Sequence, residues 1–251
     1  MADKTAPIAN RSTKSQERVI IRQAHLNEAK KIGEIAAKAY YGTELTKFLS
    51  PKRDRYYSDY ERSIKQRTFG RMTDPRTLTF VACPATDPRM PIGFIRATRL
   101  GDDEGAKKQI ASRKSVWLWV LGLLFPIWCK VVTWVFGPDR SANPLAVELL
   151  DVWSQEEKKY WGSVPERKNR WHVQCCVVSE EFQGRGVGKS LIKEVLTRAE
   201  AENVIVGLEA SAPGEKMYKK VGFELLERFK HNFEGGAGGI MMWSPPTLKK
   251  M

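Results

Sequence analysis

The sequence predicts one domain of mixed α/β architecture, built on a mixed, mostly antiparallel twisted sheet that is flanked by helices. Paired apolar runs around turns indicate two antiparallel hairpins, at residues 77–100 and 223–243. The apolar runs 171–178 and 203–211 are separated by a helical segment, which is typical of a crossover between parallel strands. At 251 residues the chain is long enough to bury a core without covalent staples.

The N-terminal part is predicted to hold a tail, a strand and two helices. Residues 1–17 are charged and have few large apolar side chains, which predicts a disordered tail and no signal peptide. Residues 18–23 form an apolar strand pattern, after which Asn27 is expected to cap a helix. A second helix is expected at residues 52–72, and the Asp-Pro pair at 74–75 ends it.

Residues 101–169 form an apolar helical segment between the first hairpin and the central strand. Its centre, residues 116–136, reaches the about 20 residues of a membrane span, but it contains Pro126 and Lys130. We expect an amphipathic helix pair, broken at Pro126, that buries Trp and Leu side chains against the domain. A helix lying on an anionic bilayer and a true span are the alternatives. The cations that flank the centre are Lys107, Lys108, Arg113, Lys114 and Arg140.

Charge and cysteine content narrow the function classes only slightly. The net charge of +13 is spread along the chain without a recognised nucleic-acid motif, so we expect no specific nucleic-acid partner. A basic surface attracts an anionic cofactor or a membrane, and it disfavours polycationic acceptors such as polyamines. The four cysteines lack metal-type spacing, so we interpret them as reduced core residues of a cytoplasmic protein.

The segment around which the prediction is organised is a glycine-rich turn, residues 183–188, between an apolar strand and an amphipathic helix. The first amides of a helix have no partners within it, and glycines let an anion approach them closely. A P-loop requires glycine where Gln183 stands. A dinucleotide fingerprint requires its third glycine where Lys189 stands, so both nucleotide motifs are excluded.

The pattern Gln-x-x-Gly-x-Gly at Gln183, Gly186 and Gly188 resembles the acetyl-CoA signature of the GCN5-related N-acetyltransferases, the GNAT family. Residues 217–223, MYKKVGF, are similar to that family's Leu-Tyr-x-Lys-x-Gly-Phe ending. The resemblance covers mainly residues 170–223.

This resemblance implies a fungal-type member of the family with a long insertion before the central strand. The acetyltransferase domain would span residues 18–244, with the insertion at 101–169 and a short tail at 245–251.

The resemblance also implies acetyl-CoA as the co-substrate and no metal. In the family, backbone amides of the turn hold the pyrophosphate, and the central strand pairs with the pantetheine arm. The residues that we expect to bind the cofactor are Cys176, Val177, Val178, Gln183, Gly184, Arg185, Gly186, Val187, Gly188, Lys189, Ser190, Ser211 and Tyr218.

Tyr218 falls on the tyrosine that, in many family members, lies near the thioester sulfur and protonates the departing thiolate. The chemistry requires such a group, because the thiolate leaves best when a proton is supplied nearby. A tyrosine at this point of a helix is otherwise often a packing residue. The resemblance therefore makes Tyr218 the candidate general acid.

The general base has more than one candidate. His172 stands where the histone-acetyltransferase branch of the family carries its glutamate base, and imidazole has a suitable unperturbed pKa. Strand alternation predicts that His172 shares a face with Gln174, Cys176 and Val178. Glu209 on the neighbouring strand is the rival base, and ordered water is the third possibility.

We therefore expect an acetyl-CoA-dependent N-acetyltransferase whose acceptor is a primary amine on a small or medium-sized, partly apolar molecule. The alternatives are a protein or peptide N-acetyltransferase, a non-catalytic acyl-CoA-binding module at a membrane surface, and a donor longer than acetyl. Six tryptophans are expected to supply an apolar acceptor pocket: Trp117, Trp119, Trp128, Trp134, Trp153 and Trp161.

Overall fold

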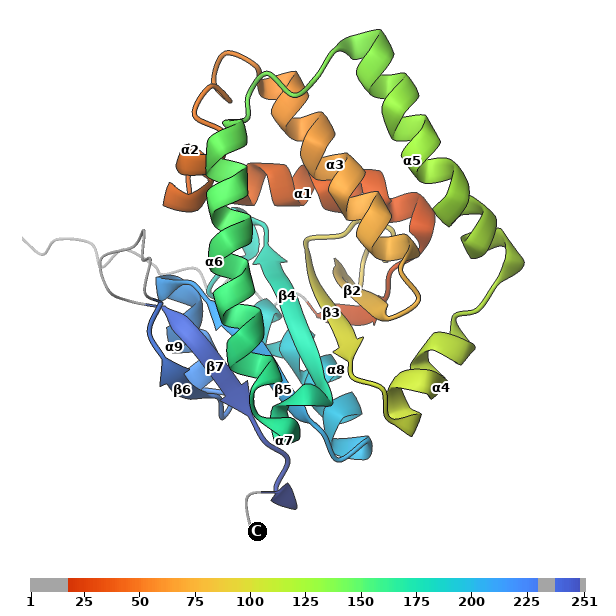
Figure 1. The fold of residues 1–251 in the computed structure, drawn as a ribbon. Coiled ribbons are helices and arrows are strands. Elements are labelled where there is room, and N and C mark those ends of the chain that lie inside the picture. The colour runs from red at the N-terminus through yellow and green to blue at the C-terminus, as the bar shows by residue number, and fades with distance from the viewer. Residues whose placement is uncertain (1–17, 230–237, 249–251) are drawn as a thin grey trace, which may run out of the picture.

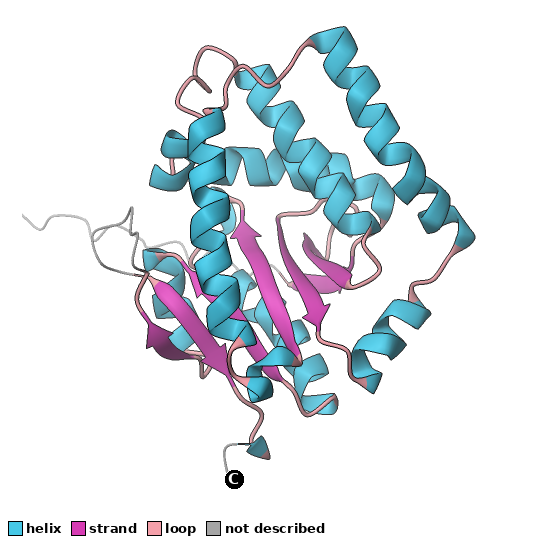
Figure 2. Cartoon of the chain, viewed as in Figure 1, coloured by secondary structure: helices cyan, strands magenta, loops and turns pink. Residues whose placement is uncertain are grey.

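The computed structural model describes residues 18–229 and 238–248, without the side chains of residues 156–159. A seven-stranded sheet in the order β1-β2-β3-β4-β5-β7-β6 forms its centre (Figures 1 and 2). Among the described strands every neighbouring pair is antiparallel except β4 and β5, which confirms the predicted mixed sheet. The strands are β1 (Val19–Gln23), β2 (Thr77–Pro84), β3 (Gly93–Leu100), β4 (Arg170–Val178), β5 (Ile205–Ala210), β6 (Glu224–Glu227) and β7 (Gly239–Trp243).

Helices cover both faces of this sheet (Figure 1). On one face, apolar side chains of α8 pack against β2 to β5 and form the largest core cluster. On the other face, α1 and α3 cover β2 to β4, and Trp161 at the end of α6 packs against β5 and β7. The helices are η1 (Leu26–Glu28), α1 (Ala29–Tyr40), α2 (Glu44–Leu49), α3 (Tyr57–Thr73), α4 (Glu104–Ser112), α5 (Val116–Phe136), α6 (Pro144–Gly162), α7 (Pro165–Lys168), η2 (Glu180–Phe182), α8 (Val187–Ala201) and α9 (Ala212–Lys219).

Two expectations for the N-terminal helices are wrong. Asn27 lies inside η1, and the start of this turn is closed by the backbone N–H of His25, which donates to the Glu28 carboxylate at 2.7 Å. The helix expected at residues 52–72 begins only at Tyr57, because a turn held by Arg53 side-chain hydrogen bonds precedes it.

The prediction for the segment around Pro126 is also wrong. α5 continues through Pro126 as one helix, and none of its residues is buried. Proline removes a single hydrogen bond inside a helix, and here regular helix continues on both sides. α5 lies along α3, where the rings of Phe125 and Phe69 approach to 5.1 Å (Figure 1). The tryptophans of α5 therefore do not pack against the sheet.

A β-bulge in β4 corrects the predicted strand face. Cys175 pairs with Arg96 and Val173 with Ala97, so Gln174 is an extra residue in the ladder. An extra residue reverses the alternation of side chains beyond it. Cys176 consequently packs in the α8 cluster together with Val173, and His172 does not share its face.

Three expectations fall outside the described residues. They concern the disordered tail at residues 1–17, residues 230–237 of the expected terminal hairpin, and the end of the short tail at 249–251. The described parts of the terminal hairpin, β6 and β7, pair antiparallel as expected.

Candidate active site

The glycine turn between β4 and α8 forms an open site for an anion. Gly186 precedes the first residue of α8 with φ of +83°, and Gly184 has φ of +73°. Both values lie in the left-handed region that glycine adopts without strain. A Cβ atom built on either residue would meet nothing within 4 Å. The first α8 amides, from Val187 onward, have no acceptor within the helix and can receive a phosphate oxygen.

The other residues of the turn hold it in place or stay exposed. The side-chain amide of Gln183 donates to the carbonyl of Val178 at 3.0 Å and so ties the turn to the end of β4. Arg185 donates to a backbone carbonyl of the preceding turn at 2.7 Å. Lys189 and Ser190 are exposed on the first turn of α8, whereas the Val187 side chain is buried and offers only its backbone. The cofactor residues expected here thus lie together around one opening.

β4 and β5 pair only along their first residues and separate toward the end of β4, which leads into the glycine turn. Their parallel register runs from Arg170 opposite Ile205 to Val173 opposite Leu208. Further along, Cys175 to Val178 pair with β3, and the end of β5 pairs with β7. The edge of β4 that faces β5 is therefore available to an extended ligand, at the residues expected to pair with the pantetheine arm.

Tyr218 on α9 closes this opening from the side. Its side chain is 7% exposed, lines the central pocket, and forms a hydrogen bond with Cys176. Burial raises the pKa of Tyr218 well above its ordinary value, so the phenol keeps its proton at neutral pH. Burial also raises the pKa of Cys176 to about 12, which disfavours a thiolate nucleophile.

The opening between β4 and β5 lies next to the glycine turn. A Cβ atom built on Gly188 would lie 3.8 Å from Cε of Met217 and 3.9 Å from Cγ2 of Val178. The start of α8, the end of β4 and the helix that carries Tyr218 therefore meet at this point. Ser211 lines the pocket, and its hydroxyl accepts from the N–H of Gly214 at 3.4 Å to cap α9.

The two candidate bases are in direct contact. Nε2 of His172 lies 2.8 Å from Oε2 of Glu209, and the indole N–H of Trp161 donates to Oε1 at 2.9 Å. The guanidinium of Arg170 donates to Nδ1 of His172 at 3.4 Å, so the imidazole proton is on Nε2 and goes to Glu209. Both imidazole nitrogens are thus engaged within the protein.

The electrostatics of this cluster keep Glu209 ionised. Burial raises the pKa of Glu209, but the hydrogen bond with His172, the bond from Trp161 and the charge of Arg170 outweigh it. The pKa of Glu209 therefore lies below its ordinary value. Burial lowers the pKa of Arg170 to about 10, and the Glu209 charge opposes this effect.

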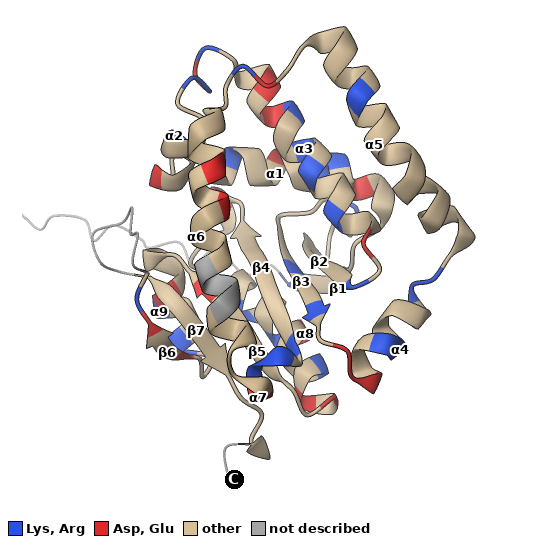
Figure 3. Cartoon of the chain, in the orientation of Figure 1, with Lys and Arg blue, Asp and Glu red and all other residues tan. Residues whose placement is uncertain are grey.

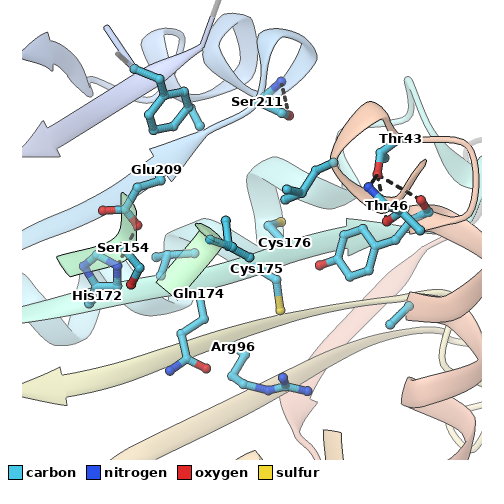
Figure 4. A pocket seen from close by; sticks show the side chains of 18 of the residues that line it. Thr43, Thr46, Arg96, Ser154, His172, Gln174, Cys175, Cys176, Glu209 and Ser211 are labelled. Carbon is cyan, nitrogen blue, oxygen red and sulfur yellow. Dashed lines mark hydrogen bonds and ion pairs between the residues drawn. The ribbon is translucent and has the colours of Figure 1, made fainter. Parts of the chain in front are cut away.

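These side chains line a pocket of about 1060 Å³ on the α1–α3–α6 side of the sheet. Figure 4 shows His172 and Glu209 at one end of the pocket, and Thr43 and Thr46 at the other. Of the six tryptophans expected here, Trp153 lines the pocket and Trp161 positions Glu209, whereas the four on α5 lie elsewhere. Of the two tryptophan-bearing helices, α6 therefore contributes to this pocket and α5 does not.

Sequence reasoning missed three features of this site. The unpredicted helix α2 supplies Leu45, Thr46 and Leu49 to the pocket, and its Thr43 cap was the available signal. The bulge at Gln174 leaves no sequence signal. Arg96 lines the pocket, and an arginine in the interior of a predicted strand was an available signal.

Residues 148–235 match the family described as the acetyltransferase (GNAT) domain. The fold is similar to that of a Corynebacterium glutamicum protein described as histone acetyltransferase HPA2 and related acetyltransferase. The TM-score is 0.58 at 15% identity, over 91% of this chain and 96% of that one. None of the curated proteins compared with the chain matches it.

Two further solved structures align at lower TM-scores. One is a putative acetyltransferase of the GNAT family from Desulfovibrio desulfuricans, with a TM-score of 0.49 at 11% identity, over 90% of this chain and 99% of that one. The other is PaiA N-acetyltransferase from Thermoplasma acidophilum in complex with coenzyme A, with a TM-score of 0.48 at 12% identity and the same coverage.

The domain match at residues 148–235 and the shared fold support an acyltransferase. Among the described residues, no group of three His, Cys, Asp or Glu side chains is arranged to hold a metal ion.

Proposed function

We propose that this chain, an acyltransferase with a GNAT acetyltransferase domain, transfers an acetyl group from acetyl-CoA to a primary amine of a small or medium-sized acceptor. The observation that carries the proposal is the separation of β4 and β5. It opens between the glycine turn at Gly186 and the buried phenol of Tyr218. An extended ligand with a phosphate at one end and a thioester at the other fits this arrangement.

Acetyl-CoA supplies the activated acetyl group, and the protein supplies binding and proton transfer. The α8 amides and the glycine turn would hold the pyrophosphate, and the free edge of β4 at Cys176–Val178 would hold the pantetheine arm. Tyr218 keeps its proton at neutral pH and would give it to the sulfur as the carbon–sulfur bond breaks.

Glu209 is the proposed partner of the acceptor amine. Its carboxylate is ionised, lines the pocket and would accept a hydrogen bond from the neutral amino group of the acceptor. It would then take the amine proton, directly or through water, while His172 and Trp161 hold it in orientation. His172 is a weaker candidate, because its Nδ1 already accepts from Arg170.

A panel of primary amines incubated with the purified protein and isotopically labelled acetyl-CoA tests the proposal. Mass spectrometry should detect transfer of the label to at least one small amine in the panel. Binding of acetyl-CoA without transfer to any amine or peptide would favour the non-catalytic acyl-CoA-binding module. Transfer only to peptides would favour a protein or peptide N-acetyltransferase.

We also propose that the protein is cytoplasmic and contacts a membrane surface through α5. Among the described residues, α5 is the helix with the length and apolarity of a membrane span. Apart from Lys130 it carries no charge (Figure 3), and Trp134 is 86% exposed. α5 contacts α3 along one side, and Lys108 and Lys114 lie exposed before its start. Both features suit a helix that lies flat on an anionic bilayer.

We further propose three finer assignments. They are a fungal-type family member, an insertion at residues 101–169 relative to the family, and domain limits at residues 18 and 244.

A further inference from the structure

Arg96 on β3 is a buried cation with two guanidinium nitrogens that lack a partner among the described residues. Its side chain is 8% exposed, and Nε and Nη2 are buried without a hydrogen-bond partner among the described residues. Its guanidinium lies near the ring of Phe94, whose centroid is 5.7 Å from the guanidinium carbon. Burying an unpaired charge is strongly unfavourable, and arginine cannot relieve the cost by losing its proton. Such a group indicates an anionic partner that binds from outside.

The unpaired guanidinium faces the acceptor pocket. Figure 4 shows Arg96 beside Gln174 and Cys175, on the side of the pocket formed by β3. The amide of Gln174 donates to Thr98 at 2.8 Å and offers Arg96 no counter-charge. Burial raises the pKa of the neighbouring Tyr40 well above its ordinary value, so that phenol is neutral and does not serve as the missing anion.

Helix α3 places two more arginines, Arg67 and Arg71, along the same pocket. Among the described residues, neither has a carboxylate within ion-pair distance, and Arg67 donates to Ser63 instead. Burial lowers the pKa of Arg67; Asp139 opposes this, and repulsion from Arg71 adds to it. Asp139 itself accepts from the hydroxyl of Ser141 at 2.5 Å. The β3–α3 side of the pocket therefore carries one buried cation, Arg96, and two exposed ones, and none of the three forms an ion pair among the described residues.

This cationic side is distinct from the proposed phosphate site of acetyl-CoA. Arg96 shares a sheet face with Phe94, which packs under α1 and α3. The glycine turn leads into α8, which packs on the opposite face against Ile95 and Ala97. At the far end of the pocket stands the ionised Glu209 carboxylate. The pocket thus has an anionic end and a cationic side.

Building on the proposed function, we propose that the acceptor is a zwitterionic amine, which carries a carboxylate or phosphate-type oxyanion as well as its amino group. Arg96 binds the oxyanion through its planar fork of N–H donors, and Arg67 and Arg71 add favourable charge. Glu209 receives the amino end. The same charge pattern predicts that polyamines, which carry no oxyanion, are poor acceptors for this pocket.

Matched acceptors test this inference. Three series of acceptors are assayed: linear ω-amino acids of two to six carbons, ω-aminophosphonates of the same lengths, and the corresponding alkylamines. Each series is tested with the parent protein and with Arg96→Met, Arg96→Lys and Arg89→Met. Arg89 lies exposed in the β2–β3 turn, so its variant controls for loss of one positive charge. In the parent, kcat/KM should favour an acidic amine over its alkylamine by about tenfold or more. Arg96→Met should remove this preference, Arg96→Lys should keep part of it, and Arg89→Met should retain it.

Comparing kcat/KM for the amino acids with kcat/KM for the aminophosphonates shows whether the pocket prefers a carboxylate or a phosphate-type oxyanion. Equal rates with acidic amines and alkylamines, unchanged in Arg96→Met, would overturn the inference and leave the proposed function standing. If no amine is acetylated, the proposed function fails, and calorimetry with propionate and propylphosphonate decides the inference. Binding to the parent that is lost in Arg96→Met supports it, and absence of binding overturns it.

The thermal stability of Arg96→Met is a second readout. Removing an unpaired buried charge should leave the melting temperature equal to that of the parent or higher. A marked fall in the melting temperature would show that Arg96 stabilises the fold, and it would overturn the role of Arg96 as an anion receptor.

Discussion

β4 and α5 are both apolar segments, yet the fold buries one and exposes the other. β4 lies in the middle of the sheet, with β3 and β5 beside it and helices on both faces. α5 touches α3 along one side, and it contains no buried residue. An apolar sequence therefore does not by itself predict burial, because the neighbouring elements decide whether the segment is covered.

The two regions should also be separable by mutation, because we propose different ligands for them. β4 and the glycine turn form the proposed acetyl-CoA site, whereas α5 is the proposed membrane contact. A change in one region should leave the other function intact.

The largest effect is expected at the glycine turn. Gly186→Asp places a carboxylate in the anion site, at a left-handed backbone position, and should weaken acetyl-CoA binding by about 10³-fold. Calorimetry measures the affinity, and liposome binding through α5 should not change. Gly42→Asp, in an exposed turn where a Cβ atom meets nothing within 4 Å, is the matched control. Unchanged affinity in folded Gly186→Asp would exclude this site.

A smaller effect is expected at the proposed base. Glu209→Gln removes the proton acceptor and should lower kcat/KM by about 10²-fold, whereas His172→Gln should cost less, since it only loosens the Glu209 carboxylate. Steady-state kinetics with one small amine compares the two variants. The reverse ranking would make His172 the base.

The pH dependence gives an independent check on the same residue. Because the pKa of Glu209 lies below its ordinary value, the carboxylate is ionised across about pH 5 to 9 and contributes no limb there. The acidic limb of kcat/KM should follow the pKa of the acceptor amine and shift between amines. A limb that stays in place for all amines and disappears in His172→Gln would contradict the assignment.

The effect expected on the α5 side is the smallest. Trp119 and Leu123 are exposed and one helical turn apart, so Trp119→Glu with Leu123→Glu should reduce binding to phosphatidylserine vesicles by about tenfold or more. Acetylation of a soluble amine should stay at the parental rate. Leu145→Glu, at an exposed leucine on α6, is the control. Parental vesicle flotation by the double variant would remove the membrane proposal.

The local patterns predicted most of the sheet and the glycine turn. The strand before Gln183, the helix from Val187 and the parallel return strand occur where the sequence indicated them, because apolar alternation and glycine act locally. The bulge at Gln174 was not predictable, since an extra ladder residue depends on the partner strand β3. The pairing of His172 with Glu209 was hidden for a related reason: it joins side chains from two strands and requires their register.

The central claim is that acetyl transfer takes place between β4 and β5, with Tyr218 giving its proton to the departing thiolate. Tyr218→Phe keeps the ring that packs beside Phe223 and removes only the hydroxyl. With a slow amine, for which chemistry limits the rate, kcat should fall by about 10²-fold while acetyl-CoA affinity measured by calorimetry stays nearly unchanged. Parental kcat in a folded Tyr218→Phe protein would contradict the claim.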